Sequence, residues 1–94
     1  MRVVDIGLLW DFASEHADAR PALEAWLAEA REAVWDSPND IKARFVSASI
    51  LSANRVVFNI KGNRYRLLVQ ISYKLKVVYI LKLGTHAEYD KWEL

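Results

Sequence analysis

The segment RYRLLVQISY, residues 64–73, constrains the fold more than any other part of the chain. Apolar or aromatic side chains occupy every second position from Tyr65 onward, and Arg64, Arg66 and Gln70 occupy positions between them. Since successive side chains of a strand point to opposite faces of a sheet, this alternation predicts a strand with one face in the core and one polar face. Strands of this kind belong to antiparallel sheets that are covered on one side only.

Two neighbouring segments predict the rest of the sheet. NRVVFNI, residues 54–60, alternates in the same way, and Gly62 and Asn63 after it can adopt the positive φ of a tight hairpin turn. The apolar run KVVYILKL, residues 76–83, follows closely enough to add a third strand to a meander. A further short strand is expected at residues 2–6.

The first half of the chain has the periodicity of helices. Residues 7–16 predict one helix, and a second shows a single apolar stripe at Leu23, Trp26, Leu27, Ala30 and Val34. We expect Asp18 to cap the second helix and Pro21 to lie in its first turn. Residues 36–40 then end this helix and begin a short third one.

The order of these elements predicts an α+β fold. We expect the short N-terminal strand and the helices to pack on one face of a small antiparallel sheet, with a short helix at the C-terminus. A chain of 94 residues is long enough for one domain, residues 1–94. The 53% of hydrophobic residues and the four Trp indicate a globular protein rather than a disordered one.

Composition excludes several classes of protein. The chain has no Cys, which excludes disulfides and Cys-based metal sites and is consistent with a reducing cytoplasm. Its longest strongly apolar run, VVYIL, is far shorter than the roughly 20 residues that a membrane-spanning helix needs. We therefore expect no membrane association.

The net charge of +1 conceals an asymmetry between the two halves. Residues 1–53 carry five Lys/Arg and nine Asp/Glu, whereas residues 54–94 carry eight Lys/Arg and three Asp/Glu. A basic second half indicates an anionic ligand. The alternative is that the two halves neutralise each other across the fold.

The cations of the second half fall on the polar positions of the predicted strands. A hairpin turning at Gly62–Asn63 would place Arg55, Lys61, Arg64 and Arg66 side by side on one open face. Guanidinium groups suit phosphate oxygens, and aromatic rings suit the stacking of bases. The nearby rings are those of Tyr73, Tyr79 and Tyr89. This face predicts binding of single-stranded nucleic acid, and the alternative is an ordinary solvated sheet face.

The C-terminal segment GTHAEYDKWEL has the spacing of a capping box. Thr85 is the expected N-cap and Glu88 the N3 residue of a helix from Thr85 to Trp92. His86, Tyr89 and Asp90 would share one face of that helix. The alternative is a C-terminal lid in which aromatic side chains cover the core.

The segments VFNIKGNRYRL and GTHAEYDK resemble the HigB-type toxins of bacterial type II toxin–antitoxin systems, which belong to the RelE-like group of mRNA interferases. The resemblance extends over essentially the whole chain. It implies a RelE-like fold and an endoribonuclease that cuts mRNA in the ribosomal A site without a metal or cofactor. It also implies a cytoplasmic protein that a helix-turn-helix, HigA-like antitoxin neutralises.

Carried over to this chain, the resemblance points to Asn63, Arg66, His86, Tyr89, Asp90 and Lys91, with Arg64 less secure. One position departs from the family pattern. Members often carry a basic residue at the position of Leu81, whereas here the charge stands next to it, at Lys82. Either the strand shifts locally or the groove lacks one cation.

A mechanism follows as a hypothesis. In RNA, the 2′-hydroxyl can attack the adjacent phosphate if a base, an acid and a cation assist it. We expect Arg66 to stabilise the transition state, with Arg55, Lys61 and Arg64 holding phosphates. His86 and Tyr89 are the acid–base candidates, and Asp90 is expected to orient His86 or Lys91. The alternative is a non-catalytic RNA- or protein-binding module on the same fold.

Overall fold

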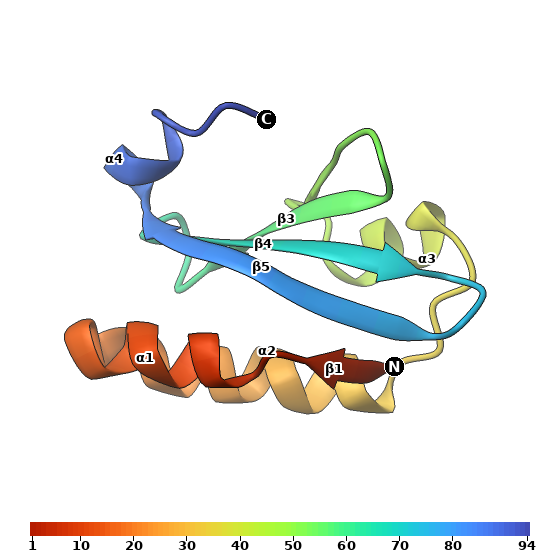
Figure 1. Cartoon of the computed structure of the whole chain (residues 1–94), viewed down its shortest axis with the longest axis horizontal. Helices are drawn as coiled ribbons and strands as arrows, with labels where there is room; N and C mark the ends of the chain where they lie inside the picture. The colour runs from red at the N-terminus through yellow and green to blue at the C-terminus, as the bar shows by residue number, and fades with distance from the viewer.

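The computed structural model describes residues 1–94 and confirms the predicted α+β fold. In chain order the elements are β1 (Arg2–Val4), α1 (Gly7–Glu15), the 3-10 turn η1 (Ala17–Ala19), α2 (Arg20–Glu32), α3 (Pro38–Arg44), β2 (Ser49–Ile50), β3 (Arg55–Ile60), β4 (Tyr65–Ser72), β5 (Val77–Thr85) and α4 (His86–Tyr89). One five-stranded sheet has the order β1-β5-β4-β3-β2 (Figure 1). None of the helices has the length and apolar character that a membrane span requires.

The sheet is mixed rather than wholly antiparallel. The strands β2, β3, β4 and β5 pair antiparallel, as predicted for the meander. The N-terminal strand β1 instead pairs parallel to β5, with Val3 opposite Val78. The sequence predicted that this strand packs with the helices on one face of the sheet, whereas it is an edge strand of the sheet itself. Alternation within a strand does not specify its neighbour, and the long connection from β1 to β5 permits a parallel pairing.

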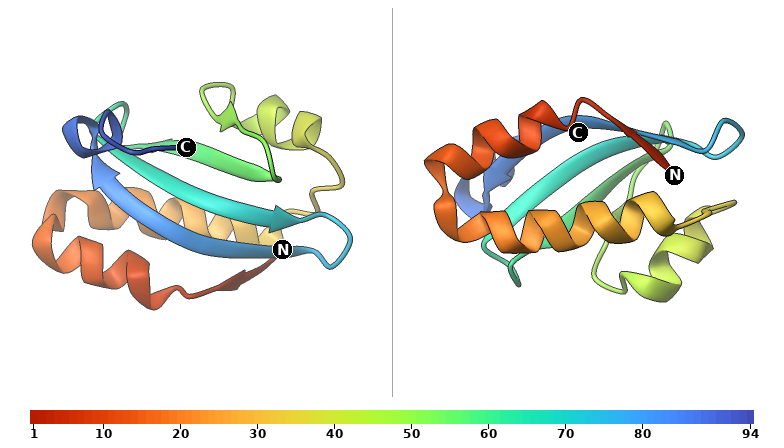
Figure 2. Two further views of the ribbon diagram at one scale, coloured as in Figure 1. Left: turned by 45° about the horizontal axis from the view of Figure 1, so that its top comes forward. Right: turned by 90° about the horizontal axis from the view of Figure 1, so that it is seen from below.

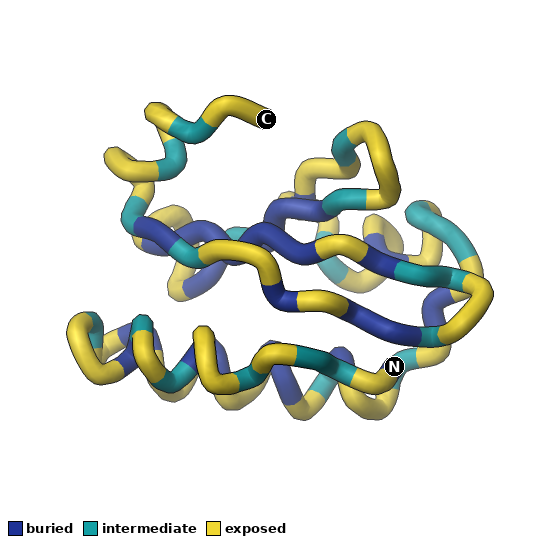
Figure 3. Tube along the Cα trace, in the orientation of Figure 1, coloured by how far each residue is buried: buried dark blue, intermediate teal, exposed yellow.

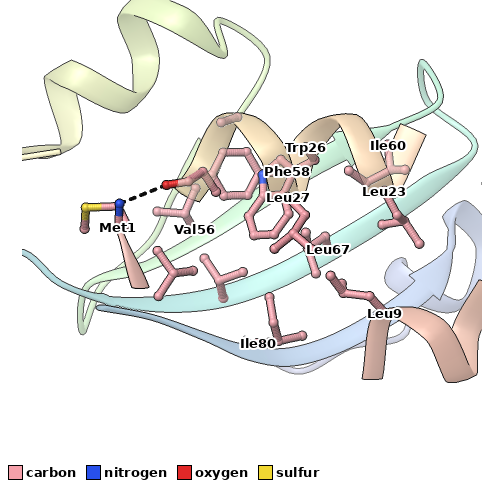
Figure 4. Close-up of a cluster of buried hydrophobic side chains, with 14 of the residues drawn as sticks. Met1, Leu9, Leu23, Trp26, Leu27, Val56, Phe58, Ile60, Leu67 and Ile80 are labelled. Atoms are coloured by element: carbon pink, nitrogen blue, oxygen red, sulfur yellow. Dashed lines mark hydrogen bonds between the residues drawn. The ribbon is translucent and has the colours of Figure 1, made fainter. Parts of the chain in front are cut away.

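The helices α1 and α2 cover one face of the sheet, and the core lies between the two layers (Figures 1 and 2). Alternate side chains of the central strands point into this layer, as their pattern predicts; they include Val56, Phe58, Ile60, Leu67, Val69, Ile71, Val78 and Ile80. The helices contribute Leu9, Leu23, Trp26 and Leu27 (Figure 4). Val34 does not join the predicted apolar stripe, because α2 ends at Glu32 and Val34 is 69% exposed.

The other face of the sheet, which we call the far face, carries no long helix. Instead α4 and the C-terminal tail, residues 90–94, lie over it (Figures 1 and 2). All residues of α4 and the tail are exposed or half-buried, in contrast to the buried strands beneath them (Figure 3). The far face is therefore bordered by the chain end on which the sequence placed its polar cluster.

A β-bulge interrupts the pairing of β4 with β5. Leu68 lies opposite Lys82, but the next residue, Val69, lies opposite Ile80, so Leu81 is the extra residue of β5. Since a bulge re-aims the side chains that follow it, Lys82 joins Leu68 on the far face and Leu81 is turned away from it. The strand thus shifts locally, which is one of the two explanations left open for the departure at Leu81.

Asp18 does not cap α2, contrary to the prediction. This helix begins at Arg20 after an Ala19 N-cap, and the Asp18 carboxylate instead accepts hydrogen bonds from Lys61 Nζ at 3.0 Å, Arg64 Nη1 at 3.1 Å and Tyr65 Oη at 2.5 Å. The Tyr65 hydroxyl and, after it, Lys61 lower the pKa of Asp18 to about 2. Asp18 therefore joins the turn between the two helices to the hairpin between β3 and β4.

We predict that Asp18→Asn destabilises the fold at neutral pH and less so in acid. The folded-state pKa of Asp18 lies below its usual value of 3.8, so the ionised carboxylate stabilises the native state above about pH 4, and this contribution is lost as the pH falls toward 2. The gap between the urea-unfolding midpoints of the wild type and the variant should be constant from pH 7 to pH 5 and should narrow as the pH falls from 4 toward 2. The control is Asp11→Asn, whose carboxylate forms no ion pair; a gap for Asp18→Asn that does not narrow in acid would contradict the prediction.

Candidate functional site

Three rows of side chains cross the far face from β3 to β4 to β5. They are Arg55–Gln70–Tyr79, Val57–Leu68–Lys82 and Asn59–Arg66–Gly84. The outer rows are polar, and the middle row adds the Lys82 ammonium through the bulge. The far face thus presents three cations on the sheet itself, which is the charge pattern of an anion-binding surface.

Arg66, in the last row, is a buried cation without an acidic partner. It is 8% exposed and is the only buried polar or charged residue of the chain. Its Nη1 donates to the carbonyl oxygens of Asn63 at 2.7 Å and Tyr65 at 3.3 Å, and no carboxylate lies within ion-pair distance. A desolvated charge is costly unless it is compensated. Within the chain, only these carbonyl oxygens, His86 and the Tyr89 ring contact its guanidinium.

The capping box of the C-terminal helix is present as predicted. Thr85 Oγ1 accepts from the Glu88 amide at 3.1 Å, and Glu88 Oε1 accepts from the Thr85 amide at 2.9 Å. The hydrogen bond from the Thr85 amide to the carboxylate is the main cause that lowers the pKa of Glu88, and the Thr85 side chain adds to it. The helix is shorter than predicted, since α4 ends at Tyr89. The Trp92 amide then donates a hydrogen bond to the Tyr89 carbonyl oxygen at 3.0 Å, which closes a tighter turn.

The predicted acid–base cluster meets Arg66. Arg66 Nη2 lies 2.9 Å from His86 Nδ1, and the guanidinium carbon lies 5.2 Å from the centroid of the Tyr89 ring. On the other side of the imidazole, His86 Nε2 lies 3.7 Å from Asp90 Oδ2. The structure therefore brings Arg66, His86, Tyr89 and Asp90 together, from one strand and one helical turn.

The protonation of His86 can be inferred from this contact. A guanidinium has only donors, so Nδ1 of His86 must accept the hydrogen bond from Arg66. The proton of the neutral imidazole then lies on Nε2, on the side of the Asp90 carboxylate. Asp90 is thus placed to orient the ring.

Gly84 allows the chain end to pack against the sheet at this point. A Cβ at Gly84 would lie 2.7 Å from Cζ2 of Trp92, closer than any real contact. The Trp92 ring also lies 5.0 Å from Lys82 Nζ and edge-on to the Tyr89 ring at 5.4 Å. The alternative of a lid over the core is not what forms, because Trp92 packs on Gly84 of the far face and neither Trp92 nor Tyr89 packs against the core cluster. Trp92 instead holds the catalytic candidates against Arg66.

An open hollow of about 600 Å³ borders the cluster. It is lined by Asn63, Arg64, Thr85, His86 and Ala87. Three of these residues, Asn63, Arg64 and His86, are among the site residues that the resemblance implies. The exposed Lys91 follows at the start of the tail. The hollow gives a ligand access to the His86 side of the cluster.

The predicted row of four cations does not form. Lys61 and Arg64 both bind Asp18, and Arg55 donates to the carbonyl oxygens of Ser52 at 3.1 Å and Leu94 at 3.0 Å. Positive φ falls on Lys61 and Gly62, not on Asn63, so the alternation of β3 does not continue through the turn. The alternation of side chains along β3 therefore does not predict which way the side chains beyond Ile60 point.

The three tyrosines that were predicted to stack with bases lie in different parts of the structure. Tyr89 lies beside Arg66, and Tyr79 lies on the far face in the row of Arg55. The prediction that Tyr73 stacks with a base was wrong. This residue packs against the core just beyond the end of β4, and its buried hydroxyl has no hydrogen-bond partner. Burial raises its pKa, and Asp40 adds to the shift.

Lys82 belongs to the far face but was not among the predicted site residues. Its placement depends on the bulge at Leu81, and a bulge leaves little trace in a pattern of apolar residues. The available signal was a single out-of-step lysine after the run VVYIL. The chain has no group of three or more His, Cys, Asp or Glu side chains arranged to hold a metal ion.

Comparison with known families finds one match. A family model described as HigB_toxin, the RelE-like toxic component of a toxin–antitoxin system, matches residues 19–92. This range includes the two strands, the turn and the helix that form the cluster around Arg66. No curated protein sequence matches the chain.

We predict that Gly84→Ala destabilises the protein by about 1–3 kcal/mol, because the new methyl group forces Trp92 and α4 off the sheet. Chemical denaturation followed by Trp fluorescence measures this loss. The control is Gly7→Ala, where a Cβ meets nothing within 4 Å and which should cost nothing. Equal stability of the two variants would show that Trp92 does not need this close approach.

Proposed function

We propose RNA cleavage as the activity of this chain, which belongs to the HigB family of RelE-like toxins. As the toxic component of a toxin–antitoxin system, it has an antitoxin as its partner. The proposed reaction is metal-independent cleavage of mRNA in the ribosomal A site. The proposed setting is the cytoplasm, with a helix-turn-helix, HigA-like protein as the antitoxin.

The observation that carries the proposal is the uncompensated charge of Arg66 in contact with His86 and Tyr89. A guanidinium binds two phosphate oxygens at once, and its charge stabilises the phosphorane that forms during attack by a 2′-hydroxyl. The other cations of the far face, Arg55 and Lys82, and the exposed Lys91 lie where they can hold neighbouring phosphates. Tyr79 supplies a ring for stacking.

The hydrogen bond from Arg66 to His86 supports a specific sequence of proton transfers. When Arg66 turns its Nη2 toward a phosphate oxygen, Nδ1 of His86 becomes free to accept the proton of the 2′-hydroxyl. The 2′-oxygen then bonds to phosphorus while the bond to the 5′-oxygen breaks, and Tyr89 donates a proton to that leaving oxygen. The products are a 2′,3′-cyclic phosphate and a 5′-hydroxyl. Asp90 stabilises the imidazolium from the Nε2 side.

We predict that Arg66→Ala lowers the rate of mRNA cleavage by about 10²–10³, the usual loss when one transition-state donor is removed. Growth arrest after induction and primer extension on mRNA from translating ribosomes measure the effect. Radiolabelling the 5′ ends with polynucleotide kinase without prior phosphatase checks for the 5′-hydroxyl. The matched control is Arg31→Ala, an exposed arginine of α2 that forms no ion pair.

Three outcomes of this experiment would overturn the proposal. The first is full cleavage by Arg66→Ala, and the second is products with 5′-phosphate ends. The third is mRNA binding by the wild type without cleavage, which would favour the non-catalytic binding module.

We predict that a substrate with sulfur in place of the 5′ leaving oxygen separates the roles of His86 and Tyr89. Sulfur leaves without a proton, so this mRNA should restore cleavage by Tyr89→Phe to near the wild-type rate but should not rescue His86→Ala. Single-turnover cleavage on purified ribosomes measures both variants on both substrates. Rescue of His86→Ala instead would make His86 the acid and exchange the two assignments.

A further inference from the structure

A second concave surface lies on the α1 side of β5, away from Arg66. It is a groove of about 320 Å³, and it is lined by Leu8, Asp11, Phe12, Glu15, Leu81, Lys82 and Leu83. The four residues from α1 are spaced i, i+3, i+4 and i+7, so one face of this helix forms one wall. The edge of β5 at the bulge forms the other wall.

This groove exposes apolar side chains that no other part of the chain covers. Leu8 is 41% exposed and Leu81 is 42% exposed. The bulge is the cause at Leu81, because it turns this side chain away from both the core and the far face. In addition, β1 pairs with β5 only at Val77–Tyr79, so the outer edge of β5 beyond Tyr79 has no strand partner. Exposed apolar side chains beside an open sheet edge are typical of a protein-binding surface.

The charge of the groove indicates the chemistry of its occupant. Asp11 and Glu15 stand one turn apart on its rim, and neither carboxylate forms an ion pair within the protein. The first 53 residues as a whole carry more acidic than basic side chains. Lys82 is the one cation of the lining, so the two carboxylates leave the groove net acidic. A net acidic surface disfavours RNA and favours a segment that combines apolar side chains with Lys or Arg.

We propose that this groove is the docking site for the antitoxin. A segment of the antitoxin places apolar side chains against Leu8, Phe12 and Leu81 and places basic side chains beside Asp11 and Glu15. This inference rests on membership of the toxin family, which supplies the antitoxin, and not on RNA cleavage. Because Arg66 lies on the far face, docking in the groove does not by itself cover the candidate active site.

The test measures the affinity of toxin variants for the small protein encoded by the reading frame next to the toxin's own. Titrations use toxin that carries Arg66→Ala, so the protein can be expressed and binding does not depend on RNA cleavage. Leu8→Asp and Leu81→Asp should each weaken binding at least tenfold. The double variant Asp11→Lys with Glu15→Lys should also weaken binding, and its loss of affinity should grow as the salt concentration falls, because the repulsion is then screened less. The matched control is Leu75→Asp, since Leu75 is 66% exposed in the hairpin at the other end of β5 and should leave the affinity unchanged.

Two results would overturn the proposal. One is an affinity that Leu8→Asp and Leu81→Asp leave unchanged, provided that their urea-unfolding midpoints match that of the parent. The other is a toxin dimer, seen by light scattering, that Leu81→Asp dissociates without a change in antitoxin affinity. In that case the occupant of the groove is a second copy of this chain. If the wild type binds the antitoxin through Leu81 but does not cleave RNA, the proposed reaction is wrong and this inference is still supported.

Discussion

The buried guanidinium of Arg66 is the feature on which the candidate site depends. It lies on β4, between β3 and β5, where the backbone is fixed by pairing on both sides. Two carbonyl oxygens hold it, but no carboxylate neutralises it. Lys61 and Arg64, which are more exposed, both form ion pairs with Asp18. The protein thus compensates the cations of the hairpin tip and leaves uncompensated the one charge that it has taken out of water.

The helix α4 serves to bring acid–base groups to that charge. It is only one turn long, and isolated helices of this length are not stable in water. Three local features hold it in place: the capping box at Thr85, the missing side chain at Gly84 and the Trp92 ring that packs where that side chain would be. The result is a contact between His86 and Arg66, which lies 20 residues earlier in the chain.

The bulge at Leu81 divides the functions of β5 between two surfaces. It places Lys82 on the far face, where its charge adds to that of Arg55 and Arg66, and turns Leu81 toward α1. A strand without a bulge would place its residue 81 on the far face and residue 82 toward the core. One inserted residue therefore supports both the basic surface proposed for RNA and the apolar groove proposed for the antitoxin.

The sequence by itself determined the meander, the helical half, the capping box and the meeting of His86, Tyr89 and Asp90 on one face, because each follows from spacing within a few residues. It did not determine the parallel pairing of β1, the role of Asp18 or the inward position of Tyr73, since these depend on which distant segments become neighbours. The alternation of polar positions predicted four cations on one face, but the positive φ of Lys61 and Gly62 interrupts that alternation in the turn. Only the tertiary structure decided which charges were paired and that the buried one, on Arg66, has no acidic partner, because ion pairs depend on which distant segments become neighbours.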